Sequence, residues 1–328
     1  MNTPRPILAI EQLAVQFATP DGPLDAVNEF SLTVHAGECI GIVGESGAGK
    51  SQSFLAIMGL LATNATVGGS AKLEGSELLN RPAAELNQVR GVRIAMIFQD
   101  PMTSLTPHIK VGEQIAESLI EHRGVSRAAA RARALELLQR VHVSDAERRL
   151  DQYPHELSGG MRQRVMIAIA LACDPVMLIA DEPTTALDVT IQAQILGLLA
   201  ELKREQGTAM VLVTHDLGVV AGVADRVAVM YGGRIVELGD VRSVLKTPSH
   251  PYTEALLRSM PRVDEPADDP LVAIEGQPPN PRRLPVGCAF HPRCRYVDDL
   301  CRRERPALTA HAGGISVACH HPVREQRA

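Results

Sequence analysis

Three short apolar runs of the chain end at residues that can do chemistry. They are 39–43 before Gly44, 176–180 before Asp181, and 210–213 before Thr214 and His215. Nearly continuous runs of this length are typical of strands buried on both faces, as in a parallel sheet covered by helices. Because ligands of such sheets bind at the carboxyl ends of the strands, we expect functional residues there.

Helical and alternating patterns surround these runs. Helical segments are expected after each run, at 50–61, 190–206 and 217–224. Residues 8–17 and 29–34 alternate apolar and polar positions, which predicts an antiparallel edge sheet. Two further runs, 226–231 and 234–238, flank Gly232-Gly233 and predict a β-hairpin.

The pattern changes in the middle of the chain and again near its end. Segments 111–122 and 126–141 place Ala, Ile and Leu at helical spacing, and Ser126 is well placed as an N-cap. From about Glu265 the sequence turns to Pro, Asp and Arg, with prolines at Pro266, Pro270, Pro278, Pro279, Pro281 and Pro285. Prolines at this density break any long element, so we expect a domain boundary near His250.

The composition is that of an ordinary globular protein with a small net charge. Apolar residues make up 45% of the 328 residues and charged residues 22%, with a net charge of −5. This balance gives no overall attraction to nucleic acid, and we expect no nucleic-acid partner. The first ten residues lack a secretory signal pattern, and the longest apolar runs are about half a bilayer span. We therefore predict a cytoplasmic chain that does not cross the membrane by itself.

A glycine-rich phosphate-binding pattern follows the first apolar run. It consists of Gly44, Glu45, Ser46, Gly47, Ala48, Gly49, Lys50 and Ser51. The glycines let successive backbone N–H groups point at phosphate oxygens, next to the N-terminus of the following helix. In such a P-loop the lysine supplies charge to the β- and γ-phosphates and the serine a hydroxyl for Mg²⁺. The pattern predicts ATP and Mg²⁺ binding.

A second pattern narrows the class of nucleotide-binding protein. Residues Leu157, Ser158, Gly159, Gly160 and Met161 precede an apolar helix at 165–172. An ordinary helix start with Ser158 as N-cap is the alternative, but a capping serine needs no Gly-Gly behind it. Together with the P-loop, this pattern resembles the signature motif of ATP-binding cassette (ABC) ATPases.

The resemblance extends to the remaining motifs of that family, in the family's order. It implies that Asp181 holds the Mg²⁺ shell with Ser51 and Gln99, and that Glu182 polarises the attacking water. It also implies that Gln99 senses the γ-phosphate, that His215 is the switch histidine, and that Asp188, after Ala186-Leu187, belongs to the D-loop. Phe17 is our candidate for stacking on adenine. Taken alone, Gln99 is an ordinary surface residue, His215 and Phe17 are ordinary core residues, and Asp181-Glu182 is an ordinary solvated pair.

The resemblance implies an α/β fold of the ABC type. It predicts a mixed or parallel core sheet flanked by helices, an antiparallel edge sheet, and an inserted helical subdomain at about 100–160. The domains expected are an ATPase domain at 1–250 and a small cysteine-containing extension at 251–328. In this family two ATPase domains meet head to tail, and Ser158, Gly159 and Gly160 of one contact the ATP on the P-loop of the other.

The C-terminal sequence resembles one branch of the family. Residues 250–257 and 276–294 are similar to the extension of importers for oligopeptides, dipeptides and nickel, and the chain most resembles the D-type subunit of oligopeptide importers. This implies import of oligopeptides, with dipeptides or nickel as alternatives. The implied partners are two transmembrane permease subunits, an extracytoplasmic peptide-binding protein and a second ATPase subunit of the F type. The chain is then peripheral on the cytoplasmic face of the plasma membrane. Soluble ABC ATPases that act on ribosomes or chromosomes are the rival class, but the chain lacks their second cassette or long heptad repeats.

Four of the six cysteines crowd into the last part of the chain. They are Cys288, Cys294, Cys301 and Cys319. A cytosolic setting argues against disulfides, and clustered thiols in a segment too short for its own core suggest a metal staple. The three interpretations are a [4Fe–4S] cluster, a zinc ion and plain thiols. The spacing lacks the Cys-x-x-Cys of common zinc sites, and all-thiolate ligation suits an iron–sulfur cluster. The family resemblance favours the cluster, with His291, His320 and His321 as competing ligands.

Overall fold

The computed structural model describes residues 6–185, 187–260, 273–311 and 313–323. Ala186, Glu265, Pro266 and Pro270 lie outside these ranges. The chain forms two compact units. Unit 1 comprises 1–8, 34–39 and 73–213, and unit 2 comprises 9–33, 40–72 and 214–328.

Parallel strands form the centre of unit 1. They are β6 (Ile94–Ile97), β7 (Met177–Asp181) and β8 (Ala209–Thr214), in the order β6-β7-β8. Every residue of the three is buried. The predicted strands at 176–180 and 210–213 are therefore confirmed. Asp181 is opposite Val213 at the carboxyl ends of β7 and β8.

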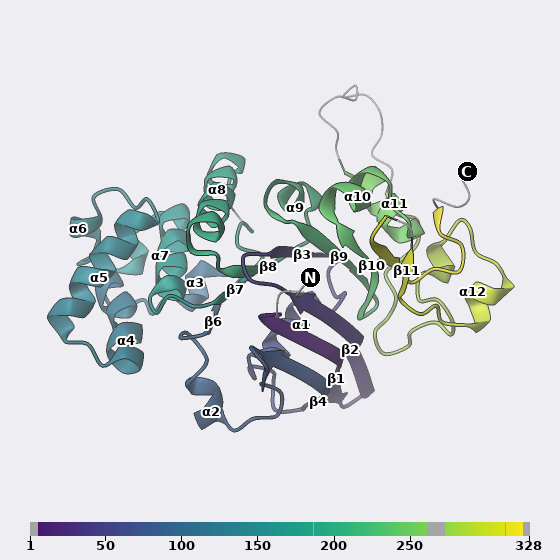
Figure 1. Ribbon diagram of the computed structural model, residues 1–328, viewed down its shortest axis with the longest axis horizontal. Coiled ribbons are helices and arrows are strands. Elements are labelled where there is room, and N and C mark those ends of the chain that lie inside the picture. The colour runs from purple at the N-terminus through teal and green to yellow at the C-terminus, as the bar shows by residue number, and fades with distance from the viewer. Residues whose placement is uncertain (1–5, 186, 261–272, 312, 324–328) are drawn as a thin grey trace, which may run out of the picture. The chain divides into compact units, whose positions relative to one another are not determined.

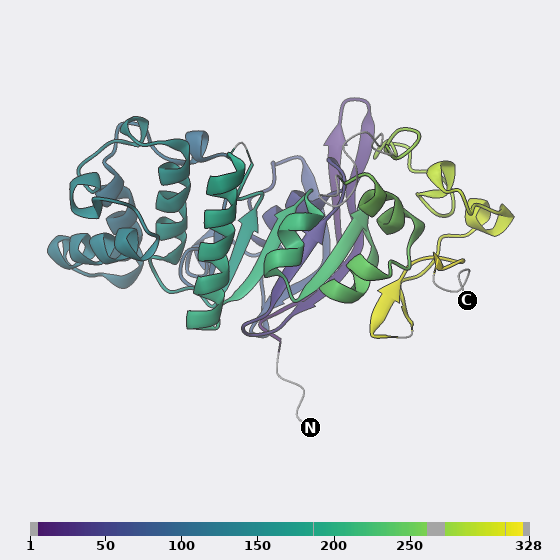
Figure 2. The same ribbon diagram turned by 90° about the horizontal axis from the view of Figure 1, so that it is seen from above.

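Helices make up most of the rest of unit 1 (Figure 1). The long ones are α4 (Val111–Arg123), α5 (Arg127–Arg140), α7 (Gly159–Leu171) and α8 (Val189–Gln206). Short elements accompany them: β5 (Ser76–Glu77), α2 (Ala83–Asn87), α3 (Pro101–Ser104), α6 (Ala146–Arg149) and η1 (Pro154–Glu156). Helices α4, α5 and α7 contact one another, and Figure 2 shows the group from a second side. Ser126 caps α5, as predicted, by accepting the N–H of Ala129 at 3.3 Å.

Unit 2 begins with the predicted edge sheet. Strands β1 (Leu8–Thr19), β2 (Gly22–Val34) and β4 (Ala65–Leu73) are neighbours in the order β2-β1-β4. On one face Phe30 of β2 meets Phe54 of α1 (Lys50–Ile57) edge to face, with ring centroids 6.1 Å apart. Helix α1 ends earlier than the predicted Leu61 because Gly59 has a φ of 60°, which terminates a right-handed helix.

The second sheet region of unit 2 joins the P-loop strand to the C-terminal extension. Its order is β11 (Thr309–His311), β12 (Ile315–Val317), β10 (Arg234–Asp240), β9 (Arg226–Tyr231) and β3 (Cys39–Val43). Strand β3 runs parallel to β9, and β9 and β10 form the predicted hairpin. Strand β12 pairs antiparallel with β10, so the extension adds strands to this sheet.

Short helices complete unit 2. They are α9 (Leu217–Val223), α10 (Val241–Lys246), α11 (Pro251–Arg258), η2 (His291–Arg293) and α12 (Asp299–Arg303). Among the described residues of the chain, none of the helices combines the length and apolar character that crossing a bilayer requires.

Candidate nucleotide site and cysteine pocket

The P-loop follows β3 in unit 2 and packs closely against neighbouring backbone. A Cβ on Gly44 would lie 2.3 Å from the carbonyl oxygen of Met230, and one on Gly49 would lie 2.3 Å from that of Ala26. Both contacts are too short for any side chain, and Gly49 also has a φ of 93°. These positions therefore accept only glycine.

Lys50 begins α1 and turns back over the loop. Its Nζ donates to the carbonyl oxygens of Gly44, at 2.8 Å, and Glu45, at 3.1 Å. The side chain is on the inner side of the loop and Lys50 is only 6% exposed. The structure thus holds an ammonium group against the carbonyls at the start of the P-loop.

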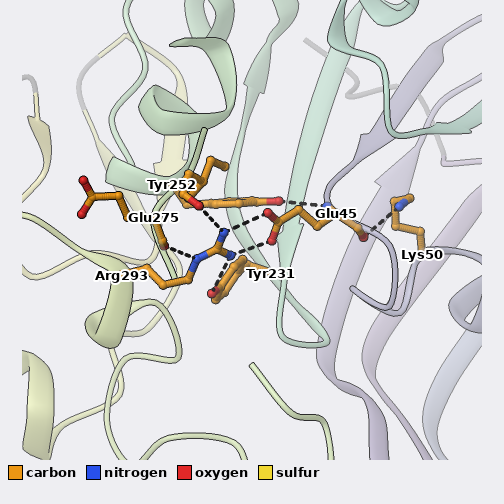
Figure 3. A network of polar contacts seen from close by, with 7 residues as sticks. Glu45, Lys50, Tyr231, Tyr252, Glu275 and Arg293 are labelled. Carbon is orange, nitrogen blue, oxygen red and sulfur yellow. Dashed lines mark hydrogen bonds and ion pairs between the residues drawn. The ribbon is translucent and has the colours of Figure 1, made fainter. Parts of the chain in front are cut away.

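Two residues of the C-terminal extension contact Glu45 of the P-loop. Its carboxylate forms an ion pair with Arg293, and its N–H donates to the hydroxyl of Tyr252 at 2.9 Å (Figure 3). A pocket of unit 2 lies beside the P-loop. It is lined by Asp25, Glu45–Ala48, Tyr231–Gly233, Pro278–Pro281 and Leu284. The proline-rich tail and the P-loop therefore line the same pocket.

Two predicted residues of unit 2 lie apart from that pocket's lining. Phe17 is half-buried on β1 and is not among the residues of the pocket. His215 is exposed directly after β8, so it is not the buried core histidine that the alternative interpretation required. Its neighbour Asp216 caps α9 by accepting the N–H of Gly218 at 2.7 Å.

The carboxylates of unit 1 stand at the end of β7. Asp181 is 5% exposed and ends the strand, and Glu182 follows with a φ of 46°. Glu182 Oε2 accepts hydrogen bonds from Gln99 Nε2 at 3.0 Å and from Thr185 Oγ1 at 2.9 Å. The two donors fix one carboxylate oxygen, so the structure brings Gln99 and Glu182 together as a pair.

Helix α7 of unit 1 begins at the signature pattern. Ser158 caps it by accepting the N–H of Met161 at 3.4 Å, and both Ser158 and Gly159 are exposed. A Cβ on Gly160 would lie 2.8 Å from Cγ2 of Ile191 on α8. The serine therefore acts as a cap, and Gly160 additionally permits the close approach of α8.

Asp188 has a similar place at the start of α8. It is exposed and caps the helix by accepting the N–H of Ile191 at 2.9 Å. The N-termini of α7 and α8 therefore meet at Ile191, which lies against Gly160.

The four C-terminal cysteines line one pocket of unit 2. Its other lining residues are His250, Pro251, Phe290, His291, Tyr296, His320 and His321. Burial raises the pKa of the Cys294 thiol to about 11 and that of Cys319 to about 12, and the neighbouring cysteines add to both shifts. Thiolates are thus unfavourable here without a nearby cation.

The donor atoms of this pocket are unevenly spaced. Among the described residues, Asp298, Cys301 and His321 form a group whose possible ligand atoms all lie within 4.8 Å of one another. Of the four thiols only Cys301 belongs to it. A hydrogen bond of 2.8 Å between His321 Nε2 and Asp298 Oδ2 already pairs two of its members.

Sequence patterns did not indicate Arg293, Tyr252 or Asp298 as functional residues. Arg293 lies one residue before Cys294 and Tyr252 follows the helix-starting Pro251, but neither position carries a motif. Only the contacts of the folded chain place them beside the P-loop and the cysteines.

Comparisons with known proteins place the chain among transport ATPases. A family model described as "ABC transporter" matches residues 27–185, and one described as "Oligopeptide/dipeptide transporter, C-terminal region" matches 236–301. The chain is 54% identical over 319 residues to the oligopeptide transport ATP-binding protein OppD of Salmonella typhimurium, covering 97% of this chain and 95% of that protein. It is 49% identical over 321 residues to the dipeptide transport ATP-binding protein DppD of Haemophilus influenzae, covering 98% and 97%.

A solved structure gives the same picture of the fold. The dimeric structure of MJ0796, a bacterial ABC transporter cassette, matches with a TM-score of 0.65 and 30% sequence identity. The match covers 72% of this chain and 99% of that one. The expected ABC fold is confirmed.

Proposed function

Because this chain belongs to the family of oligopeptide and dipeptide transport ATP-binding proteins of ABC transporters, we propose that it binds and hydrolyses ATP to power import of oligopeptides across the cytoplasmic membrane. The observation that carries this proposal is the 54% identity to an oligopeptide transport protein over 97% of the chain. A dipeptide importer is the second candidate, favoured by 49% identity to a dipeptide transport protein.

The P-loop residues provide the nucleotide-binding part of the proposal. Gly44 and Gly49 let the loop pack against the carbonyls of Met230 and Ala26, where any Cβ would clash, and Lys50 brings a cation to the loop. As magnesium ligands we propose Ser51, Asp181 and Gln99, which offer hydroxyl, carboxylate and amide oxygens. Bound Mg²⁺ supplies neutralisation of phosphate charge. Of the other P-loop members, Ser46 and Gly47 would offer backbone N–H groups, and that of Ala48, which donates to the carbonyl of Glu45 at 3.2 Å, would have to turn to the phosphate.

Hydrolysis is assigned to Glu182 with two assisting residues. The fixed carboxylate of Glu182 orients and polarises the attacking water, and Gln99 holds that carboxylate by the hydrogen bond already described. His215, exposed beyond β8, contacts the γ-phosphate as a switch residue. Phe17 stacks on adenine in this proposal, which its half-buried place on β1 permits.

A facing subunit completes each nucleotide site. The exposed Ser158 and Gly159 at the N-terminus of α7, together with Gly160, would contact the γ-phosphate held by a partner's P-loop. Asp188, exposed at the start of α8, would communicate across that dimer. We propose an F-type ATPase as the partner, with two permease subunits and an extracytoplasmic peptide-binding protein completing the importer. The chain would then be peripheral on the cytoplasmic face.

Among the described residues, the four thiols of the cysteine pocket do not have the spacing that a single ion bound by four thiolates needs. Four thiolates around zinc would place the sulfur atoms about 3.8 Å apart, given tetrahedral bonds of about 2.3 Å. Three of the four thiols lie outside the tight donor group, so a zinc ion on all four would require them to move closer together. We therefore propose that Cys288, Cys294, Cys301 and Cys319 hold a [4Fe–4S] cluster that staples the extension. Zinc on Asp298, Cys301 and His321 is the alternative that metal analysis distinguishes.

Transport by the reconstituted importer tests the function. The complex would be assembled in vesicles, with ATP on the side of the membrane that the ATPases face. Labelled peptides of two and of five residues would be supplied on the opposite side, together with the peptide-binding protein. We expect uptake of the longer peptide that depends on ATP and is lost in Glu182→Gln. Uptake of only the dipeptide would select the second candidate, and ATP hydrolysis without uptake of either peptide would reject peptide import.

A further inference from the structure

The C-terminal extension reaches the P-loop through one arginine. Arg293 is the last residue of η2, and its guanidinium contacts both carboxylate oxygens of Glu45. NH1 donates to Oε2 at 2.7 Å and NH2 to Oε1 at 3.1 Å. This is the bidentate geometry in which arginine binds a carboxylate most strongly. The side chain of Arg293 is 4% exposed and that of Glu45 25%, so the pair is largely shielded from water.

The remaining donors of Arg293 are all used. NH1 also donates to the hydroxyl of Tyr231 at 3.3 Å. NH2 donates to the carbonyl of Ile274 at 3.3 Å, and Nε to that of Glu275 at 3.0 Å. Figure 3 shows Arg293 reaching toward Glu45 with both tyrosines beside the pair. A guanidinium held at every N–H has one orientation, so it is a rigid anchor for its carboxylate partner.

The backbone of Glu45 is fixed at the same time. Its N–H donates to the hydroxyl of Tyr252, and its carbonyl accepts from Lys50 Nζ. Tyr252 comes from α11 and is fully buried. The residue that follows Gly44 in the P-loop is thus held through its side chain, its N–H and its carbonyl, and the first two contacts come from beyond residue 250.

A glycine-rich loop needs such an anchor for a physical reason. Glycine has more backbone freedom than any other residue, and a loop that must become ordered on binding loses affinity in proportion to that ordering. A contact that orders the loop beforehand lowers this cost.

We propose that Arg293 is a positioning residue for nucleotide binding, through which the C-terminal extension holds Glu45 and keeps the P-loop in one conformation. The inference rests on the proposed ATP-binding function. It assigns the extension a direct part in nucleotide affinity, whereas the cysteine pocket by itself accounts only for holding the extension together.

The test compares ATP affinity and turnover in the assembled importer. We expect Arg293→Gln to raise KM for ATP, and the Kd of a fluorescent ATP analogue, about tenfold, because a shielded charge pair and its hydrogen bonds are lost. We expect kcat at saturating ATP to change less than about twofold, since Arg293 touches no reacting group. Arg293→Lys keeps the positive charge but cannot form the bidentate contact, so its KM for ATP should lie between those of wild type and Arg293→Gln.

Three further variants separate positioning from general damage. Glu45→Gln should give a similar rise, and Glu45→Gln combined with Arg293→Gln should be no worse than either alone, because both remove one interaction. Arg295→Gln is the matched control. It removes an arginine two residues away that pairs with Glu254 and not with the P-loop, and KM should stay within about twofold of wild type.

The outcomes are distinguishable from failure of the proposed function. If the wild-type complex binds no nucleotide, the proposed function is wrong. If wild type binds it and Arg293→Gln leaves KM unchanged, or if the two single effects add, the positioning role is wrong. Should Arg293→Gln fail to assemble, Glu45→Gln and Arg293→Lys give the same comparison.

Discussion

Gln99 Nε2 donates a 3.0 Å hydrogen bond to Glu182 Oε2 across 83 residues of sequence. Gln99 follows β6 and Glu182 follows β7, and these strands are parallel neighbours. Residues after adjacent parallel strands meet at the same sheet edge, so the pairing follows from topology. Gln99 thereby orients the carboxylate to which we assign water activation.

Replacing that carboxylate should stop turnover while leaving nucleotide binding intact. We expect Glu182→Gln to lower ATP hydrolysis by at least about 100-fold, the usual effect of losing a general base. ATP-bound dimers should accumulate and be visible by size-exclusion chromatography. Glu201→Gln is the control, because Glu201 lies half-buried on α8 and pairs with His142. Wild-type turnover in Glu182→Gln would show that another residue activates water.

Removal of the P-loop cation should act on binding. Lys50→Ala deletes the ammonium that contacts the carbonyls of Gly44 and Glu45, so phosphate charge is no longer neutralised. We expect at least about a tenfold rise in the Kd of ATP by equilibrium fluorescence titration. Lys246→Ala, exposed at the end of α10, should bind like wild type. Equal affinities in the two variants would contradict the assignment of Lys50.

Alanine substitutions at the two glycines of the signature pattern should differ in their effect on the stability of the protein. A Cβ on Gly160 meets Ile191 at 2.8 Å, whereas one on Gly159 lies an ordinary 3.8 Å from Leu187. We expect Gly160→Ala to cost about 1–3 kcal/mol in free energy of unfolding, as overpacking does, and Gly159→Ala to cost less than about 1 kcal/mol. Denaturant unfolding measures both, and Ile191→Ala should relieve Gly160→Ala. No difference between the glycines would disprove the packing explanation.

Stability should depend on pH through His250. Burial lowers the pKa of this imidazole from 6.5 to about 3, and the side chain caps α11 by accepting the N–H of Tyr252. Between these pH values the unfolded chain binds a proton that the folded chain does not. Stability is therefore complete above about pH 6.5 and is lost on acidification by up to about 1.4 kcal/mol per pH unit until about pH 3. The free energy of unfolding would be measured with urea at several pH values in this range. On acidification it should fall less steeply in His250→Asn than in wild type, by up to about 1.4 kcal/mol per pH unit. Identical slopes would argue against a neutral buried imidazole.

Metal content tests the cysteine pocket. Anaerobically purified protein should contain iron and acid-labile sulfide with visible absorbance, and Cys319→Ser should lose most of all three because one thiolate is missing. Cys39→Ala should keep them, because Cys39, in β3, is not among the residues that line this pocket. Zinc without sulfide would instead select Asp298, Cys301 and His321, and absence of both metals would leave the thiols without a ligand role.

Local patterns decided much of the fold. Strand β3, the β9–β10 hairpin at Gly232-Gly233 and the Ser126 cap of α5 were predicted at or near their observed positions. Each depends on apolar runs, turn residues or a cap within a few neighbours, and such signals are contained in the sequence itself. The nucleotide-binding motifs and their order along the chain can likewise be read from the sequence alone.

Only the tertiary structure decided which distant residues meet. That β12 pairs with β10, that Gly160 admits Ile191, and that Arg293 holds Glu45 across 248 residues have no local pattern. These contacts depend on how elements pack after they form, and a single arginine in a proline-rich tail looks the same in the sequence whether it is solvated or anchored. Residue types and their order thus determined the class of chemistry, while packing determined what holds the P-loop in place.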